Sequence, residues 1–332
     1  MEMREAVIVA AVRTPIGKAK RGGLATVRAD EMAGIVIKEL LNRTPKLDPA
    51  DIDDVILGCA FPEGEQGMNM ARLTAMGAGL PYTVPAETIN RFCSSGVQSI
   101  AHAAQGIMSG QIEVAIAGGA ESMTQVPMTG YKFAPNLAQA ESNPEAFTNM
   151  GLTSENVAEK YNVTRAEQDA FAVKSNQKAA KAVDSGLFDA EIIPVDVEVV
   201  EVGANGKPAT RKYTVSRDEG PRGNSTVEGL ARLGTPFKTN GTSTAGNSSQ
   251  MSDGAAAVII MSAEKAEELG IKPLARYVSY AVGGVPPEIM GMGPTAAIPK
   301  ALKLAGLDKD DIDLFELNEA FASQSLAVMR EL

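Results

Sequence analysis

Short apolar runs and amphipathic segments alternate over the first part of the chain. Residues 6–12 and 55–60 are almost wholly apolar, a pattern typical of buried strands. Residues 29–41 and 70–79 carry apolar side chains at helical spacing and predict two helices. Residues 114–120 form a third apolar run. Because strands alternate with helices, the pattern predicts a layered α/β architecture whose sheet is covered on both faces.

Residues 94–109 predict a long helix that is apolar almost all round, and we expect it to be buried. The short extended segment 88–90 precedes it, which places Cys93 at the helix N-terminus. There the unpaired N–H groups and the positive end of the helix dipole favour a thiolate over a thiol. Cys93 is therefore a candidate nucleophile. The alternative is a small buried core cysteine, the commoner role of a free cysteine.

The pattern then changes to long loops rich in Pro, Gly, Asn, Ser and Thr. Two helices are predicted among these loops, at residues 154–161 and 165–185. We interpret residues 122–250 as an inserted domain rather than a linker, because they contain apolar segments of their own, such as residues 192–195. A buried strand at residues 253–261 and a short helix follow.

Basic side chains gather in one part of this insertion, although the whole chain has a net charge of -10. A locally positive segment in an acidic protein suits a phosphate-bearing ligand. A solvated loop with scattered charges is the alternative. Residues 205–240 contain seven basic side chains (Lys207, Arg211, Lys212, Arg217, Arg222, Arg232 and Lys238) and three acidic ones (Asp218, Glu219 and Glu228).

One segment of the chain occurs twice. Residues 46–61 align without gaps on residues 306–321, with Leu, Asp, Asp, Ile, Asp, Ala and Phe at matching positions. A helix near residues 298–304 leads into the second acidic turn and strand, as in the first copy, and residues from Val278 onward resemble the first strand. The chain therefore holds two copies of one α/β unit.

Two adjacent positions of the repeat differ in chemistry. In place of Gly58 the second copy has Asn318. In place of Cys59 it has Glu319, which suggests a function that only one copy carries; a polar cap on a strand end is the alternative. The same offset takes Cys93 to position 353, so we expect the second unit to be incomplete within these 332 residues.

A cysteine nucleophile usually needs a base within hydrogen-bond reach. His102 is the only histidine, and it lies further along the helix that follows Cys93. The separation along the helix axis is about 13 Å, too far for contact within one chain. We interpret His102 as a packing or interface residue, and no Ser-His-Asp or Cys-His-Asn triad is supported.

Composition and cysteine count narrow the class of protein. A sequence pI of about 4.9 disfavours non-specific binding to nucleic acid or an anionic membrane. Two cysteines give neither a disulfide framework nor zinc-ligand spacing, so we expect a reducing compartment and no metal. The chain opens directly on a strand pattern, without a leader and without an apolar run long enough for a membrane span. These features predict a cytoplasmic protein.

Taken together, several motifs resemble those of the thiolase family. They occur in family order over the whole chain, so chance agreement is a poor explanation. The motifs are residues 90–96 (NRFCSSG), 118–123 (GGAESM), 150–156 (MGLTSEN), 244–249 (TAGNSS), 252–257 (SDGAAA) and 318–322 (NEAFA).

The resemblance implies the thiolase fold, in which two βαβαβαββ halves form a five-layered α-β-α-β-α core. The implied N-terminal half comprises residues 1–121 and 251–270. Residues 122–250 would be the inserted loop domain that holds coenzyme A. Residues 271–332 would be the start of the C-terminal half, with its second unit incomplete. The family also implies a homodimer or homotetramer.

The implied activity is thiolysis of a 3-ketoacyl-CoA by coenzyme A, a co-substrate rather than a permanently bound cofactor. Cys93 would attack the 3-keto carbon, acetyl-CoA would leave, and coenzyme A would release the shortened acyl-CoA. Asn318 would hold a water of the oxyanion hole. Arg222, Ala245 and Ser249 match positions that bind coenzyme A, whereas Met150, Met290 and Phe321 match the acyl pocket.

The sequence departs from the family pattern at two places. The Gly-His-Pro motif and a second catalytic cysteine are not found in these 332 residues, so we expect this chain to be inactive alone. Asn149-Met150 stands where acetoacetyl-CoA thiolases tend to have His-Met, which favours a degradative 3-ketoacyl-CoA thiolase. The alternatives are an acetoacetyl-CoA-forming biosynthetic thiolase and a catalytically incomplete CoA-binding protein. A ketoacyl synthase is disfavoured, because those enzymes use two histidines.

Overall fold

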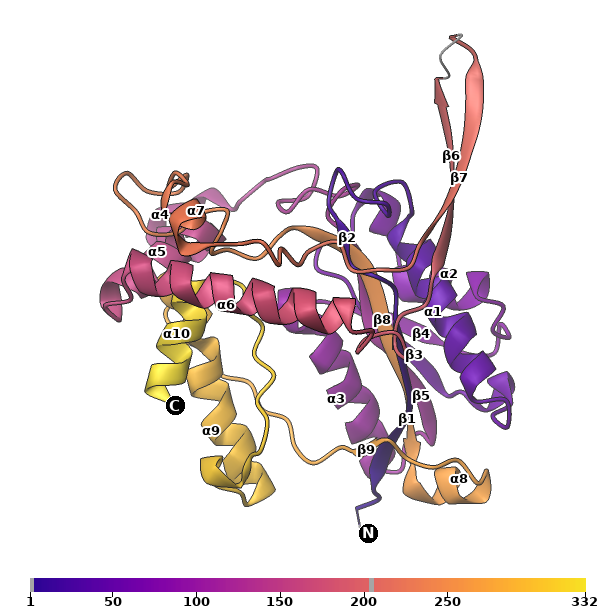
Figure 1. The fold of residues 1–332 in the computed structure, drawn as a ribbon. Coiled ribbons are helices and arrows are strands. Elements are labelled where there is room, and N and C mark those ends of the chain that lie inside the picture. Colours follow the sequence, from indigo (N-terminus) through magenta and orange to yellow (C-terminus); the bar gives the residue numbers. More distant parts are fainter. Residues whose placement is uncertain (1–2, 203–205) are drawn as a thin grey trace. The chain divides into compact units, whose positions relative to one another are not determined.

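A computed structural model describes residues 3–202 and 206–332 (Figure 1). The chain divides into two compact units, each built from several stretches of sequence. Unit 1 comprises Met1–Phe133, Gly186–Gly220 and Met251–Tyr277. Unit 2 comprises Ala134–Ser185, Pro221–Gln250 and Val278–Leu332. The bounds of these units differ from those of the expected domains. Residues 186–220, which we expected within the insertion, belong to unit 1.

Within its described residues, unit 1 contains a seven-stranded mixed sheet in the order β4-β3-β5-β8-β1-β9, with β2 paired to β8. β3 is parallel to both β4 and β5, whereas β8 is antiparallel to β5 and β1. The parallel pairs require crossover helices, and the helices predicted between these strands supply them. The strands are β1 (Ala6–Arg13), β2 (Gly17–Lys18), β3 (Asp54–Gly58), β4 (Ala86–Ile89), β5 (Val114–Ser122), β8 (Ser252–Ser262) and β9 (Ala275–Arg276).

Helices cover both faces of this sheet, as the apolar runs predict (Figure 1). Val55 and Leu57 of β3 pack in one core with α1 and α2, whereas Ile56 packs in a second core with α3. A strand buried on both faces has no polar side, which is why these strands read as continuous apolar runs. The helices of unit 1 are α1 (Ala29–Arg43), α2 (Met70–Gly77), α3 (Ser95–Met108) and α8 (Ala263–Glu268), with 3-10 turns η1 (Pro49–Asp51), η2 (Gly64–Gln66) and η3 (Phe92–Ser94).

The helix predicted at residues 94–109 is present as α3, but the expectation that it is buried all round is wrong. One side packs on the sheet through Ala103, Ala104 and Ile107. On the other side Val97 is 60% exposed, and His102 is also exposed.

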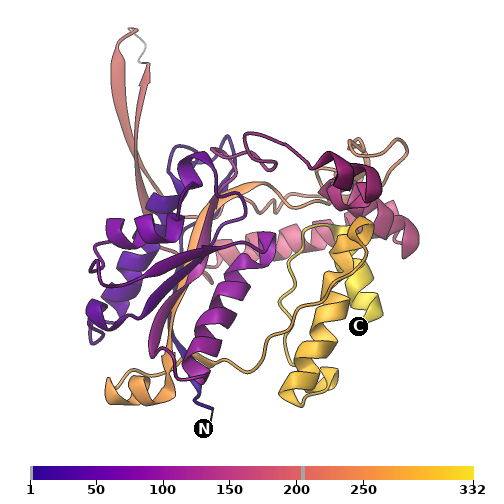
Figure 2. The same ribbon diagram turned by 180° about the vertical axis from the view of Figure 1, so that it is seen from behind.

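A long two-stranded hairpin, β6 (Val195–Val202) and β7 (Pro208–Val215), also belongs to unit 1. Val195, Val197 and Val215 at its base join the core of α1 and α2. Its far end extends away from that core, where Val200 and Val202 are exposed (Figure 2). The hairpin is therefore anchored at one end only.

Unit 2 is mainly helical in its described residues. Its main core joins Val157 of α5, Ile289 and Met292 of η5, and Ala327 and Val328 of α10. α9 and α10 lie side by side in both views (Figures 1 and 2). Its elements are α4 (Leu137–Ser142), η4 (Pro144–Phe147), α5 (Met150–Lys160), α6 (Arg165–Asp184), α7 (Val227–Ala231), η5 (Pro287–Met292), α9 (Gly293–Ala305), η6 (Lys309–Asp311) and α10 (Ala322–Glu331).

The repeat is visible in part. The turn η6 (Lys309–Asp311) recurs at the position that corresponds to η1 (Pro49–Asp51). The predictions of a strand after this turn and of a strand from Val278 onward are both wrong, because neither segment forms a strand. A strand needs a hydrogen-bonded neighbour. The segment that aligns with β3 is not covered in this way, and the side chain of Leu314 within it is 75% exposed.

Candidate active site

Cys93 lies in the turn η3 at the N-terminal end of α3, as the sequence predicts. It is exposed, so the alternative of a core cysteine is wrong for this residue. An accessible thiol in this setting is suited to nucleophilic attack.

Serine side chains build the turn around Cys93. The backbone N–H of Arg91 donates to Ser95 Oγ (2.8 Å), and Ser95 Oγ donates to the carbonyl oxygen of Phe92 (2.7 Å). Ser94 Oγ donates to the carbonyl oxygen of Arg91 (2.9 Å). These bonds tie together backbone groups of the turn that precedes α3, whereas the cap residue Ser94 makes no side-chain bond to the first N–H groups of the helix.

Gly58, at the end of β3, allows α3 to begin close to the sheet. A Cβ atom at position 58 would lie 2.4 Å from the Cβ of Ser95, closer than real Cβ atoms come. Only glycine fits this close approach of strand and helix. The residue therefore helps to set where the N-terminus of α3, and with it Cys93, lies.

The second cysteine, Cys59, has the opposite surroundings. Its side chain is only 1% exposed, and burial together with the neighbouring Glu121 carboxylate raises the pKa of the thiol to about 12. A thiol with this pKa is not ionised near neutral pH and is a poor nucleophile.

His102 does not serve as a base for Cys93 in the described geometry. It lies on α3, and its Nδ1 atom is 3.8 Å from Glu87 Oε1 on β4. Both side chains are partly exposed. The interpretation of His102 as a packing or interface residue fits this position.

Two of the motifs meet in unit 2. Ser248 and Phe321 form an isolated antiparallel bridge. The N–H of Ser249 donates to the carbonyl oxygen of Ala320, and the N–H of Ala322 donates to that of Asn247, both at 2.9 Å. The structure thus brings the predicted binding residues Ser249 and Phe321 into one backbone junction.

The loop that carries Ala245 is fixed by a buried amide. Asn247 Oδ1 accepts from the N–H of Thr244 (2.7 Å), and Asn247 Nδ2 donates to Asp169 Oδ1 on α6 (2.9 Å) and to the carbonyl oxygen of Thr242 (3.0 Å). Ala245 is exposed at the tip of this loop. Sequence reasoning missed Asp169, because nothing in its local pattern points to a partner so distant in the chain.

The buried carboxylate of Glu155 fixes Thr242 and Ser243, which precede Ala245 in the same loop. Glu155 of α5 is 3% exposed and accepts from the N–H of Thr242 (2.8 Å), from Thr242 Oγ1 (2.9 Å) and from the N–H of Ser243 (2.8 Å). The neighbouring Ser154 Oγ lies 2.5 Å from Ser243 Oγ and 2.7 Å from Ser323 Oγ. The motif at residues 150–156 therefore supports the loop that carries Ala245.

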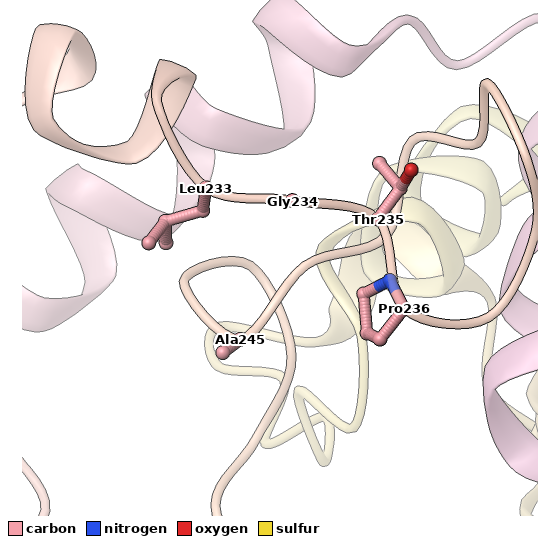
Figure 3. A pocket seen from close by; sticks show the side chains of 5 residues that line it. All are labelled: Leu233, Gly234, Thr235, Pro236 and Ala245. Carbon is pink, nitrogen blue, oxygen red and sulfur yellow. The ribbon is translucent and has the colours of Figure 1, made fainter.

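An open hollow of about 430 Å³ lies beside Ala245 (Figure 3). Four consecutive residues form its other wall, Leu233, Gly234, Thr235 and Pro236. The lining is mostly apolar, as is common where proteins bind small molecules.

The remaining predicted residues are placed as follows. Asn318 and Arg222 are exposed, and the N–H of Arg222 donates to Asn176 Oδ1 (3.1 Å). Met150 begins α5, and Met290 in η5 is 44% exposed. The ring of Phe321 packs edge-on against Phe237, with 6.4 Å between the ring centroids. Cys93 belongs to unit 1 and the other seven predicted residues belong to unit 2.

The basic segment is divided between the units, and part of its charge is locally balanced. Arg211 and Lys212 pair with Glu201 and Glu198 along the hairpin of unit 1. In unit 2, Lys238 pairs with Glu159 of α5, and this ion pair raises the lysine pKa.

Across residues 3–202 and 206–332, no group of three or more His, Cys, Asp or Glu side chains is placed to hold a metal ion. Over the same ranges, none of the helices combines the length and apolar character that a membrane span requires.

Comparison with known families decides the classification. Residues 6–264 match the N-terminal domain of thiolase, and residues 271–332 match its C-terminal domain. The chain belongs to the thiolase family. This thiolase chain is 59% identical over 330 residues to the 3-ketoacyl-CoA thiolase of Bacillus subtilis (strain 168), covering 99% of the chain and 84% of that relative. It is 46% identical to the peroxisomal 3-ketoacyl-CoA thiolase B of Mus musculus, covering 99% and 76%.

The solved structures agree with this assignment. The acetyl-CoA acetyltransferase of Bacillus anthracis matches with a TM-score of 0.87 and 40% identity, covering 99% of this thiolase chain and 84% of that structure. The acetyl-CoA acetyltransferase of Syntrophomonas wolfei matches with a TM-score of 0.87 and 38% identity. The predicted thiolase-like α/β fold is therefore confirmed.

Proposed function

We propose that this chain supplies Cys93, the acyl-accepting nucleophile, to a thiolase that cleaves 3-ketoacyl-CoA with coenzyme A to give acetyl-CoA and a shortened acyl-CoA. The observation that carries the proposal is an exposed cysteine at a helix N-terminus, inside a thiolase motif. The name of the Bacillus subtilis relative, 3-ketoacyl-CoA thiolase, supports the substrate class.

The proposed reaction has two acyl-transfer steps. The Cys93 thiolate attacks the C3 carbonyl carbon, and the C2–C3 bond breaks with its electron pair on C2. Protonation of C2 gives acetyl-CoA, and the acyl group remains on Cys93 as a thioester. The thiolate of coenzyme A then attacks this thioester, and the shortened acyl-CoA leaves as Cys93 is regenerated.

Residues of unit 2 would bind the substrates. Ala245 beside the apolar hollow and Ser249 at the motif junction are suited to the pantetheine chain, and the exposed guanidinium of Arg222 can stack on adenine. Met150, Met290 and Phe321 would line the acyl pocket, where flexible methionines tolerate different chain lengths. Asn318 would hold the oxyanion-hole water that stabilises developing charge.

Acylation of Cys93 tests the proposal directly. The chain, and a chimera in which the remaining C-terminal segment of the Bacillus subtilis relative is appended, are incubated with acetyl-CoA and measured by intact-protein mass spectrometry. We expect addition of one acetyl group in the chimera, retained in Cys59→Ala and lost in Cys93→Ala. Failure of both proteins to gain an acetyl group would overturn the assignment of Cys93.

A second candidate is the condensing direction, which forms acetoacetyl-CoA. The structural likeness to the Bacillus anthracis acetyl-CoA acetyltransferase favours it, whereas Asn149-Met150 favours the degradative direction. Rates of thiolysis of acetoacetyl-CoA and of a longer 3-ketoacyl-CoA distinguish them. Faster cleavage of the longer substrate supports the degradative assignment.

We also propose a homodimer or homotetramer. β4 lies at one edge of the sheet in unit 1, and Tyr82 and Phe92, which precede and follow it in the chain, are exposed. An edge strand beside exposed apolar groups suits association with a second copy. Light scattering after gel filtration measures the mass of the assembly.

The two free cysteines support a cytoplasmic location, which we propose on that ground.

A further inference from the structure

Phe92, the residue before Cys93, has a left-handed backbone conformation with φ of 46°. Bulky side chains rarely adopt this conformation, which persists only where the surroundings hold it. The side chain of Asn90 supplies such a hold, because its Oδ1 accepts from the N–H of Phe92 (2.8 Å). Asn90 therefore fixes the backbone on which Cys93 is presented.

Asn90 also ties the turn to a different part of unit 1. Its Nδ2 donates to the carbonyl oxygen of Ala60 (2.9 Å), just beyond β3. The rings of Phe61 and Phe92 pack with 6.0 Å between their centroids. The segment 60–61 thus contacts the Cys93 turn by a hydrogen bond and by an aromatic pair.

A carboxylate fixes that segment in turn. Glu121, near the end of β5, accepts from the N–H of Ala60 (2.7 Å), from the N–H of Phe61 (3.4 Å) and from Gln66 Nε2 (2.6 Å). Gln66 is fully buried, donates to the carbonyl oxygen of Phe61 (3.0 Å), and accepts from the N–H of Ser122 (2.5 Å). The donors and acceptors of this network come from the end of β5, from the segment that follows β3, and from η2.

We propose that Asn90 and Glu121 are positioning residues for Cys93: Glu121 anchors residues 60–61, and Asn90 carries that anchorage to the turn that presents the thiol. The proposal deepens the proposed function and rests on it for the role of Cys93. Neither side chain needs to touch the substrate, because each acts through the backbone of the turn.

The physical consequence is a change in the reactivity of the thiol. The field of a helix N-terminus acts only over the first turn, so its effect on a reacting sulfur depends on where the turn holds Cys93. Without Asn90, Phe92 is free to leave the left-handed region and Cys93 moves with it. We therefore expect the reactions of the Cys93 thiol to slow.

The test measures alkylation of Cys93 by iodoacetamide as a function of pH, with the labelled peptide identified by mass spectrometry. The variants are Asn90→Ala, Glu121→Gln and a control, Asn69→Ala. Asn69 is also an exposed amide, which donates to the carbonyl oxygen of Ala86 and accepts from the N–H of Arg72 and from Thr88 Oγ1. Its bonds therefore go to α2 and β4 rather than to residues 60–61 and the Cys93 turn. Circular dichroism checks that each variant is folded.

We expect Asn90→Ala to lower the alkylation rate of Cys93 at neutral pH by about tenfold, because the thiol is no longer held at the start of α3. Glu121→Gln keeps one acceptor oxygen and is expected to have a smaller effect of the same sign. Asn69→Ala should leave the profile unchanged. An unchanged profile for Asn90→Ala, or an equal loss in Asn69→Ala, would overturn the proposal.

The readout is independent of the proposed acyl transfer, because iodoacetamide needs no coenzyme A site. If the Asn90 effect is found but acetyl-CoA does not label Cys93, the positioning role stands and the proposed function fails. If acetyl-CoA labels Cys93 but Asn90→Ala is alkylated like the unchanged chain, the proposed function stands and the positioning role fails.

Discussion

Ser248 pairs with Phe321 across an isolated antiparallel bridge, although the two residues are far apart in the sequence. The bridge joins the motif at residues 244–249 to the motif at residues 318–322. Hydrogen bonds from the N–H groups of Ser249 and Ala322 flank it. The relative placement of these two motifs therefore depends on main-chain groups, which side-chain substitutions leave intact.

Replacing Ser249 by proline tests this dependence. Proline has no N–H to donate to the carbonyl oxygen of Ala320, so Ser249→Pro should lower the free energy of unfolding by about 1 kcal/mol or more. Ser249→Ala keeps the N–H, and we expect a change within about 0.5 kcal/mol. Urea unfolding measures both. Equal stability of the two variants would mean that the backbone bond contributes little.

The buried carboxylate of Glu155 should be sensitive to loss of its acceptor character. It accepts from three donors of Thr242 and Ser243, and glutamine would place an NH2 group against them. Glu155→Gln should therefore lower the free energy of unfolding by about 1–3 kcal/mol. The control is Glu159→Gln on the same helix, which breaks an exposed pair with Lys238 and should be nearly neutral. Similar losses in both variants would contradict the special role of Glu155.

Cys59 predicts a pH dependence of stability at alkaline pH. Burial and Glu121 raise the pKa of its thiol from 9.0 to about 12, so the folded protein keeps a proton that the unfolded chain releases. The thiol thus adds stability below pH 9.0, and this contribution is lost as the pH rises towards 12, at about 1.4 kcal/mol per pH unit.

Comparison with Cys59→Ala isolates this effect from the titration of other groups. The variant should be less stable than the unchanged chain near neutral pH, because it loses a buried side chain. The difference should shrink by about 1–2 kcal/mol between about pH 8 and about pH 10. A difference that stays constant over this range would show that the Cys59 thiol ionises equally in both states.

Much of unit 1 could be predicted from the sequence, because its strands and helices are defined by local periodicity. Residues 6–12 and 114–120 became strands, and Cys93 lies at the start of α3. The strand predicted near residue 314 is wrong, because a strand also requires a hydrogen-bonded neighbour, and periodicity does not reveal whether one is present.

The candidate site could be predicted only as separate motifs. Spacing identified Cys93, but it could not reveal that Asn90 bonds to Ala60 or that Glu121 anchors the segment beyond β3. Such contacts depend on which strands are neighbours in the sheet. In unit 2, Asn247 and Asp169 were missed for the same reason, because a buried amide and its distant acceptor leave no periodic signal.

The ion pair between Arg13 and Asp218 predicts a pH dependence of the opposite sign. Burial alone would raise the pKa of Asp218, but hydrogen bonds from Arg13 and from the N–H of Ile16 hold it below its usual value of 3.8. The carboxylate therefore adds stability above that pH, and the contribution is lost as the pH falls through the lowered pKa. Asp218→Asn should cost about 2–3 kcal/mol at neutral pH and make acid unfolding less steep. Glu5→Gln breaks the exposed pair with Arg276 and serves as the control. Urea unfolding at neutral and acid pH measures the free energy of unfolding of each variant. If this free energy falls as steeply with acidification in Asp218→Asn as in the unchanged chain, the assignment is contradicted.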